Sequence, residues 1–156
     1  MIIAIDTNII FDILLRDPNH MEISKALLDE AVNLGRLVIC EAVFAELATQ
    51  FPSKHSLQNF LADTRIQLLG SEANSLWLAS QAWGLYTTKR DKYFQCLQCG
   101  TRSTLHCHCG TLISARQHII SDFLIGGHAQ TQANTLLSRD RGFYKKYFPA
   151  LNLNLA

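Results

Sequence analysis

The sequence predicts an α/β sandwich built around a mostly parallel sheet. Short apolar runs alternate along the chain with segments of helical periodicity, which is the pattern of strands and helices in such sandwiches. The first run, MIIAI at residues 1–5, is continuously apolar, as a strand buried on both faces requires. A chain of 156 residues is long enough for one core, so we expect a single domain over residues 1–156.

Apolar spacing and capping residues divide the first half of the chain into elements. Asp6, Thr7 and Asn8 offer N-cap side chains for a first helix, and Gly35 ends a second. The predicted elements are a strand at 1–5, helices at 9–15 and 21–34, a strand at 37–40, helices at 41–51 and 56–64, and a strand at 66–69.

The second half continues this alternation on either side of one unusual segment. We predict helices at 72–89, 118–133 and 140–148, a strand at 134–138 and an edge strand at 151–155. Trp77, Trp83 and Phe123 are expected to be buried by packing. Residues 89–117 are polar, rich in Cys and His and poor in apolar periodicity, so we interpret them as an insertion between two helices.

Composition and the N-terminal run limit the function classes. The formal net charge of +1 argues against a strongly basic nucleic-acid binder, so any nucleic acid must contact local patches. Asp6 interrupts the first apolar run too early for a secretory signal or a membrane span, and we therefore expect a cytoplasmic protein without a membrane partner. In a reducing compartment, clustered cysteines favour metal ligands or redox groups over disulfides.

Four carboxylates stand where the predicted elements could bring them together. Asp6 follows the first strand, Glu46 lies shortly after the second, Asp140 follows the strand at 134–138, and Asp122 lies on a mostly apolar helix face. If they converge, each pair of charges about 4 Å apart repels by about 4 kcal/mol, so the cluster needs divalent cations. Oxygen ligands suit Mg²⁺ or Mn²⁺, and the chemistry this predicts is metal-dependent phosphodiester hydrolysis.

Each acid also has a simpler interpretation. Asp6 and Asp140 fit helix N-caps, Glu46 fits a solvated helix residue, and Asp122 fits a first-turn residue that the helix dipole favours. Spacing alone leaves both interpretations open.

Four stretches of the sequence together resemble a known nuclease family. They are DTNII after the first strand, VFAEL on the following helix, SDFLIGGHA around Asp122, and LLSRDRGFYKKYFP near the end. In this order they resemble PIN-domain nucleases, specifically VapC-type toxins of bacterial toxin–antitoxin pairs. The resemblance extends over nearly the whole chain outside the insertion.

The resemblance implies a PIN-like three-layer α/β/α fold and a single-strand-directed endoribonuclease that a cognate antitoxin blocks. We also expect a homodimer. The catalytic residues, and ligands of Mg²⁺ or Mn²⁺, would be Asp6, Glu46, Asp122 and Asp140. Glu41 competes with Glu46 because it stands directly at a strand end, but the family places its glutamate before a leucine on the helix, as at Glu46.

Polar and basic residues flank these acids. Thr7, Asn8 and Ser138 are placed either to hydrogen-bond metal-bound water or to cap helices. The candidates for RNA-phosphate contacts, with a solvated helix face as the alternative, are Arg139, Arg141, Lys145 and Lys146.

The insertion carries four of the five cysteines. Cys96-Leu97-Gln98-Cys99-Gly100 has the spacing of a zinc knuckle, whereas His106-Cys107-His108-Cys109-Gly110 is less regular. We expect a zinc ribbon at 89–117 with a structural Zn²⁺ on Cys96, Cys99, Cys107 and Cys109, or with His106 in place of Cys107. A structural ion is favoured over a redox pair, because the pattern does not indicate a dithiol motif at a helix N-terminus. It is favoured over a catalytic zinc, because four good ligands leave no position for water. Cys40 is expected to be a small core residue.

A second class of function stays open. On a degenerate PIN scaffold, the chain would be a non-catalytic nucleic-acid or protein adaptor with the zinc ribbon as its contact surface. The family members that the chain resembles join these helices by a shorter loop, so the insertion is where this sequence departs from the family.

Overall fold

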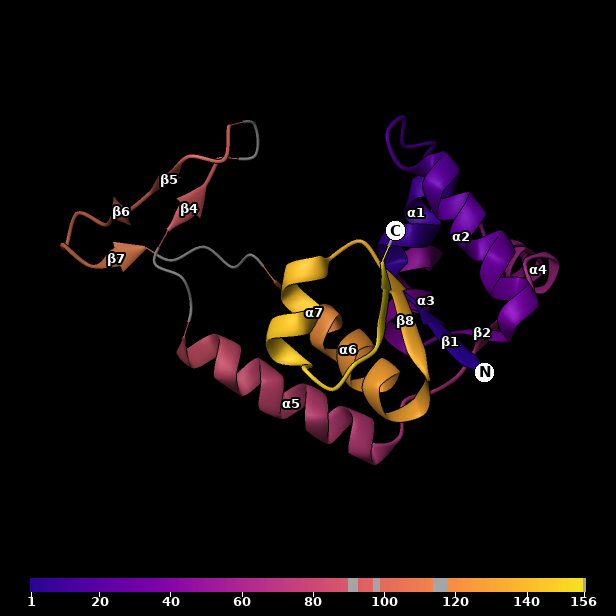
Figure 1. Cartoon of the computed structure of the whole chain (residues 1–156). Helices are drawn as coiled ribbons and strands as arrows, with labels where there is room; N and C mark the ends of the chain where they lie inside the picture. The colour runs from indigo at the N-terminus through magenta and orange to yellow at the C-terminus, as the bar shows by residue number, and fades with distance from the viewer. Residues whose placement is uncertain (90–92, 97–98, 114–117, 156) are drawn as a thin grey trace.

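The computed structural model describes residues 1–89, 93–96, 99–113 and 118–155 (Figure 1). Its helices are α1 (Thr7–Leu14), α2 (Met21–Leu34), α3 (Glu41–Ala48), α4 (Lys54–Asp63), α5 (Ala73–Thr88), α6 (Ile120–Gln132) and α7 (Arg141–Tyr147). Its strands are β1 (Ile2–Ile5), β2 (Arg36–Ile39), β3 (Ile66–Leu68), β4 (Phe94–Gln95), β5 (Arg102–Ser103), β6 (Leu105–His106), β7 (Leu112–Ile113), β8 (Thr135–Ser138) and β9 (Leu153–Leu155). Every helix and strand predicted from the sequence occurs, with bounds shifted by a few residues.

The central sheet has five strands in the order β3-β2-β1-β8-β9, and all its pairs are parallel. β1 lies in the middle, with Ile3 opposite Leu37 of β2 and Thr135 of β8. Ile3, Ala4 and Ile5 are all buried, which explains the apolar run without polar alternation. The predicted α/β sandwich is confirmed, and β9 is the edge strand predicted near the end of the chain.

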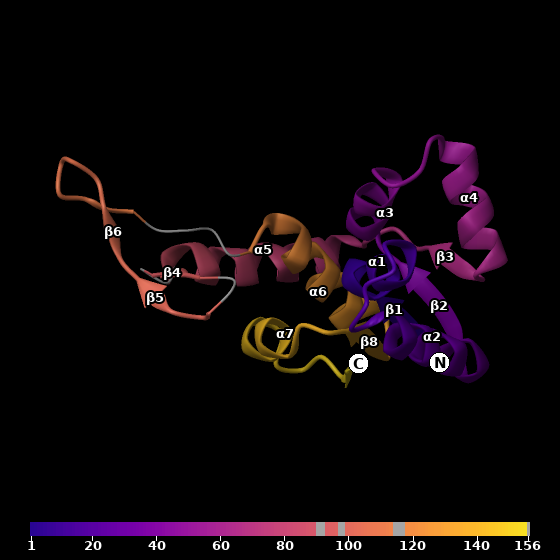
Figure 2. The ribbon, with the colours of Figure 1, turned by 90° about the horizontal axis from the view of Figure 1, so that it is seen from above.

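Three helices pack together beside the sheet through aromatic rings and small residues. α5, α6 and α7 lie on one side of the molecule, with α1, α2 and α4 on the other (Figures 1 and 2). The Phe123 ring of α6 lies 4.9 Å from the Phe143 ring of α7 and 5.4 Å from the Tyr86 ring of α5, centroid to centroid. Gly127 lets α6 approach α5, because a Cβ there would lie 2.4 Å from the Ser75 carbonyl oxygen.

The topology brings two of the predicted site residues to neighbouring strand ends. β1 and β8 run parallel and side by side, so their carboxyl ends lie at the same edge of the sheet. Asp6 directly follows β1, and Asp140 lies two residues after β8.

One predicted core residue lies on the surface. Trp77 is 69% exposed, although Trp83 is partly buried and Phe123 completely so. α5 meets α6 through Ala79, and Trp77, two positions earlier, points away from this contact because successive helical residues turn by about 100°. The expectation that Trp77 is buried was therefore wrong.

Between α5 and α6, the described residues form two separate antiparallel hairpins. β4 pairs with β5, and β6 pairs with β7. Both hairpins project away from the sheet and its helices (Figures 1 and 2). Within the described ranges, no helix combines the length and apolarity needed to cross a membrane.

Candidate active site

Asp6 is buried at the carboxyl end of β1, beside the first turn of α1. It occupies the N-cap position of α1, but its side chain makes no capping hydrogen bond, so the capping interpretation is wrong for this residue. Its Oδ2 instead accepts hydrogen bonds from Asn8 Nδ2 at 2.7 Å, Ser138 Oγ at 2.6 Å and Tyr144 OH at 3.1 Å. Three donors on one oxygen fix the carboxylate, and Oδ1 accepts no hydrogen bond from a described residue.

Glu46 reaches the same region from α3. It is half-buried, and its Oε2 accepts a hydrogen bond from the hydroxyl of Thr7, the residue after Asp6. Glu41 is turned elsewhere, because its Oε2 accepts hydrogen bonds from Ser71 N at 3.0 Å and Ser71 Oγ at 2.9 Å. Burial alone would raise the pKa of Glu41. Hydrogen bonds from its own backbone N–H and from Ser71 outweigh burial, so the pKa is lowered overall. Of the two glutamates, Glu46 lies beside Asp6.

Asp122 and Asp140 each stand at the N-terminus of a helix. Asp122 Oδ2 accepts a hydrogen bond from Ile119 N at 3.0 Å and lies 3.4 Å from His118 Nδ1. Asp140 Oδ1 accepts one from Phe143 N at 2.9 Å and caps α7. Both acids therefore do cap helices, as the simpler interpretation proposed, but each uses one carboxylate oxygen. The other oxygen has no hydrogen-bond partner among the described residues.

The charges of the acids act on one another. The pKa of Asp6 is raised from 3.8 to about 6, and burial is the largest cause. Hydrogen bonds from Ser138 and Tyr144 oppose this shift. The negative charges of Asp122 and Glu46 reinforce it and thus make Asp6 harder to ionise.

Tyr144 is affected by the charge of Asp140 as well as by those of Asp6 and Asp122. Its buried hydroxyl, the donor to Asp6 Oδ2, has a pKa raised well above its usual value near 10. The causes are burial and then the charges of Asp6, Asp122 and Asp140, so the hydroxyl keeps its proton and remains a donor. Sequence reasoning missed Tyr144, although its position four residues after Asp140 places both on one face of a helical pattern.

The donor set fits a hard divalent cation. All four acids offer oxygen ligands, and His118 beside Asp122 is the one basic side chain paired with any of them among the described residues. No three of the four acids place carboxylate oxygens within 4.8 Å of one another. The four acids are therefore not assembled around one ion in this structure, and Mg²⁺ or Mn²⁺ at these residues stays a prediction.

Comparison with protein-family models matches residues 3–149 to the PIN domain. The chain belongs to the PIN domain family. Its fold is similar to that of VapBC2 from Rickettsia felis, solved bound to a promoter DNA fragment, at 19% identity and a TM-score of 0.60 over 99% of this chain and 98% of that chain. VapBC-1 from nontypeable Haemophilus influenzae gives 16% identity and a TM-score of 0.64 over the same shares of the two chains. At these identities the likeness shows the fold alone. Among curated proteins, none matches the sequence.

A second acidic group of this PIN domain lies on α1 and the turn after it. Asp12, Asp17 and His20 offer ligand atoms within 4.8 Å of one another, the one such set of three among the described residues. Its buried member is already paired: Asp12 Oδ1 lies 2.8 Å from Arg139 Nη2, and Oδ2 accepts a hydrogen bond from Ser24 Oγ at 2.6 Å. We regard the group as structural. The guanidinium of Arg139, a candidate for RNA contact, is paired with this buried carboxylate, and a contact with RNA stays a prediction.

A cavity of about 330 Å³ adjoins the acidic site of the PIN domain. Its lining residues are Tyr86, His118, Asp140, Gly142, Phe143, Lys146 and Tyr147. The rings of His118 and Phe143 lie 4.3 Å apart, and Lys146 Nζ lies 5.1 Å from the centre of the Tyr147 ring. Aromatic rings and a cation therefore stand next to one of the four acids. Lys145 is exposed on the same helix, and the side chain of Arg141 lies outside the described residues.

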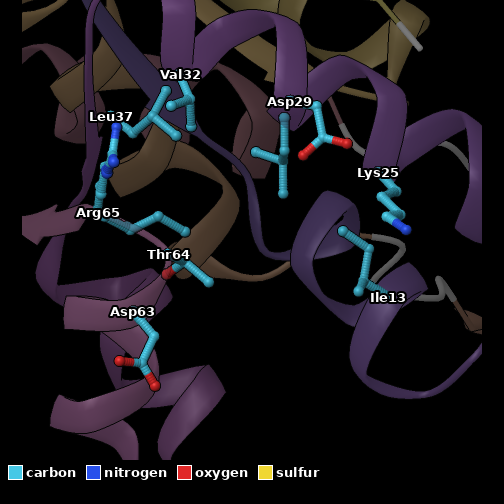
Figure 3. Close-up of a pocket in the computed structure, with 10 residues that line it drawn as sticks. Ile13, Lys25, Asp29, Val32, Leu37, Asp63, Thr64 and Arg65 are labelled. Carbon is cyan, nitrogen blue, oxygen red and sulfur yellow. The ribbon is translucent and has the colours of Figure 1, made fainter.

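A larger cavity of about 500 Å³ lies elsewhere on the PIN domain, among residues of α1, α2 and α4. Figure 3 shows apolar Ile13, Val32 and Leu37 in its wall together with charged Lys25, Asp29, Asp63 and Arg65. None of the four acids lines this cavity, so it is separate from the candidate active site.

The predicted zinc ligands lie on two different hairpins. Cys96, Cys99, Cys107 and Cys109 are all exposed, and no three of the described Cys or His ligand atoms lie within 4.8 Å of one another. The four-ligand zinc site is therefore not assembled in this structure, and the zinc stays a prediction. Cys40 is a buried core residue, as predicted, and burial raises the pKa of its thiol to about 11.

Proposed function

We propose that this PIN domain is a divalent-metal-dependent endoribonuclease and the toxin of a toxin–antitoxin pair. The observation that carries the proposal is the fixed carboxylate of Asp6, which has three donors on one oxygen and two further carboxylates acting on its charge. A buried carboxylate held in this way is suited to bind a cation with its remaining oxygen. Membership of the PIN family supports the nuclease class.

The side chains divide into ligands and residues that position them. The proposed ligands and catalytic residues are Asp6, Glu46, Asp122 and Asp140. When bound, Mg²⁺ or Mn²⁺ supplies an activated water and clamps a phosphodiester oxygen for in-line attack. Asn8 and Ser138 hold Asp6, and Thr7 holds Glu46, so these polar residues act on the ligands rather than on the RNA. A Zn²⁺ in the insertion has a structural role in this proposal and takes no part in cleavage.

The cavity beside Asp140 supports RNA as the substrate. The rings of His118 and Tyr147 offer stacking surfaces for unpaired bases, and Lys146 offers a positive charge for a phosphate. Stacking of this kind needs bases that are not already paired, which favours single-stranded segments. Lys145 and Arg141 would extend the contact along α7.

The proposed partner is a cognate antitoxin protein. The two solved structures named above are VapBC structures, and this likeness supports a partner of the same kind. A homodimer and a cytoplasmic location complete the proposal.

Cleavage assays with the purified full-length chain test the function. The protein is incubated with single-stranded and structured RNA in Mg²⁺, Mn²⁺ or EDTA. We expect metal-dependent cleavage that favours single strands, and a loss of about 100-fold or more in Asp6→Asn and Asp122→Asn, because each removes a charged ligand. Asp63→Asn, which changes an exposed carboxylate at the other cavity, is the matched control and should keep full activity.

Two results would contradict the proposal. Cleavage that persists in EDTA would show that the reaction needs no metal ion. Unchanged activity in both aspartate variants would show that the acidic site is not the catalytic site. RNA binding without cleavage by the wild-type protein would instead favour the non-catalytic adaptor.

A further inference from the structure

The four cysteines of the insertion stand on two hairpins that are built alike. In the first, β4 pairs with β5, and Cys96 N donates to the Thr101 carbonyl oxygen at 2.9 Å. In the second, β6 pairs with β7, and Cys107 N donates to the Thr111 carbonyl oxygen at 2.8 Å. The first cysteine of each pair therefore closes the loop of its hairpin.

The second cysteines are equivalent as well. Cys99 Sγ lies 3.1 Å from Thr101 Oγ1, and Cys109 Sγ lies 3.2 Å from Thr111 Oγ1. Each hairpin thus places its second sulfur in the same relation to the same kind of partner residue.

A glycine follows each pair and completes the likeness. Gly100 has a φ of 72° and Gly110 a φ of 83°, a left-handed conformation that other residues adopt only with strain. Gly100 N donates to the Cys96 carbonyl oxygen at 2.9 Å, and Gly110 N to that of Cys107 at 2.8 Å. Each pair of cysteines is therefore carried by a hydrogen-bonded turn that ends at a left-handed glycine, and the second turn is one residue shorter.

This equivalence explains the irregular spacing of the second pair. Its loop is one residue shorter, so C-x-C stands where the first hairpin has C-x-x-C. The alternative ligand His106 lies within β6, opposite Leu112, one residue before the loop-closing position. Side chains of successive strand residues point to opposite faces, so Cys107 rather than His106 takes the place that Cys96 has in the first hairpin.

Packing alone does not account for an ordered insertion. Among the described side chains of residues 93–113, none is buried. A lone two-stranded hairpin is marginally stable in water, and small units without a core are commonly held by disulfides or a metal. The four cysteines are exposed free thiols, and thiolates are strong zinc ligands.

We propose that one structural Zn²⁺ joins the two hairpins through Cys96, Cys99, Cys107 and Cys109. Each hairpin is half of a tetrahedral site with Zn–S distances of about 2.3 Å, and the ion brings the two halves together. On binding, each thiol becomes a thiolate and gives its proton to solvent or buffer, so four protons leave for one ion. The site goes beyond the nuclease function, and it stands whether or not the carboxylates cleave RNA.

Metal analysis of the full-length protein tests the site. Protein purified without chelator should contain about one zinc per chain, because four-thiolate sites hold the ion tightly. Replacement by Co²⁺ should give the thiolate-to-metal charge-transfer bands and the intense visible bands of a tetrahedral all-sulfur site. After chelation, limited proteolysis should cut within residues 93–113, and it should do so far more slowly in the zinc-loaded protein.

Two variants test the ligand set. Cys107→Ser should lose zinc and become protease-sensitive in the insertion, whereas His106→Ala should keep about one zinc per chain. His108→Ala, a substitution between two ligands, is the matched control and should also keep the ion. Circular dichroism of the helices confirms in each case that the domain is folded.

Each contrary result overturns a stated part of the proposal. Zinc kept by Cys107→Ser and lost by His106→Ala would give the third position to the histidine. A metal-free chain with a protease-resistant insertion would refute the site, and so would disulfides found in its place by mass spectrometry. Because zinc content is read without RNA, failure here is distinct from failure of the nuclease assay.

Discussion

The acidic site and the cysteine-bearing hairpins are held by different forces. Asp6 is buried, and three donors from β8 and two helices fix one of its oxygens. The four cysteines are exposed on two-stranded sheets without buried side chains among those described. Asp6 is therefore held in place by hydrogen bonds and burial without an ion, whereas the proposed Zn²⁺ would join the two hairpins into one unit. In this account, long-range packing holds Asp6, and ligand chemistry would hold the hairpins.

The largest expected effect is on global stability, and it should separate the two regions. Phe123 is completely buried among rings of α5 and α7, so Phe123→Ala should lower the free energy of unfolding by about 3–5 kcal/mol. Cys96→Ser removes an exposed thiol and should change the global value by less than about 0.5 kcal/mol. Urea unfolding followed by helix circular dichroism measures both. A similar loss in both variants would show that the hairpins are part of the core.

The next effect concerns Asp6 and pH in the metal-free protein. Its pKa is about 6 in the folded chain against 3.8 as a reference, so the native state binds more protons between these values. Stability should therefore fall by about 3 kcal/mol as pH rises from about 4 through 6. Asp6→Asn has no carboxyl group to ionise at this position, so its free energy of unfolding should not fall in this way. Relative to the wild type, the variant should become more stable as pH rises from about 4 through 6.

Urea unfolding in EDTA at several pH values between 4 and 7 measures this difference. Asp63→Asn should follow the wild type, because its side chain is exposed. Mn²⁺ should restore the wild type at pH 7 without stabilising Asp6→Asn. If the free energy of unfolding changes with pH equally in the wild type and in Asp6→Asn, then burial does not raise the pKa of Asp6.

A smaller effect is expected from a residue that only positions a ligand. Tyr144→Phe removes one of the three donors to Asp6 Oδ2 and should weaken Mn²⁺ binding by about 10-fold. Tyr147→Phe, on the same helix but half-buried beside Lys146, is the matched control and should bind Mn²⁺ as the wild type does. Equal affinity in all three proteins would show that the Tyr144 hydroxyl has a packing role only.

The smallest predicted change concerns RNA. Lys146→Ala should weaken RNA binding only a few-fold. It should also reduce the slope of log affinity against log salt concentration by about one, because one phosphate contact is lost. Lys25→Ala, at the cavity away from the acids, should change neither quantity. Fluorescence anisotropy of a labelled single-stranded RNA at several salt concentrations, with Asp6→Asn as background to prevent cleavage, gives both values. An unchanged salt dependence would exclude Lys146 from the RNA surface.

The elements of this fold were predictable from the sequence because their signals are local. Continuous apolar runs mark β1 and β8, and helical spacing with caps marks the helices between them. The expectation failed at Trp77, where the spacing of apolar residues on α5 did not reveal which side faces α6. A helix that packs against one neighbour leaves part of an apolar pattern exposed.

The sequence pointed to the acids of the candidate site and to some of their polar neighbours, but not to all of their partners. Asp6 and Asp140 were placed by their strands, yet Tyr144 and the pairing of Arg139 with Asp12 depend on contacts between distant parts of the chain. The spacing of residues along the sequence does not predict contacts between distant parts of the chain. The cysteine pairs were visible in the sequence, but the equivalence of Cys107 with Cys96 required the hydrogen bonds of both hairpins.

Binding of Mn²⁺ in the absence of RNA most directly tests whether the four carboxylates hold the ion. Calorimetry on zinc-loaded protein would compare the wild type with Asp6→Asn and with Asp17→Asn, a variant of the second acidic group. We expect Asp6→Asn to weaken binding by at least about 10-fold, since it removes the charge of a ligand, and Asp17→Asn to leave binding unchanged. Loss of Mn²⁺ binding in Asp17→Asn with full binding in Asp6→Asn would place the ion at the other group and contradict the proposed active site.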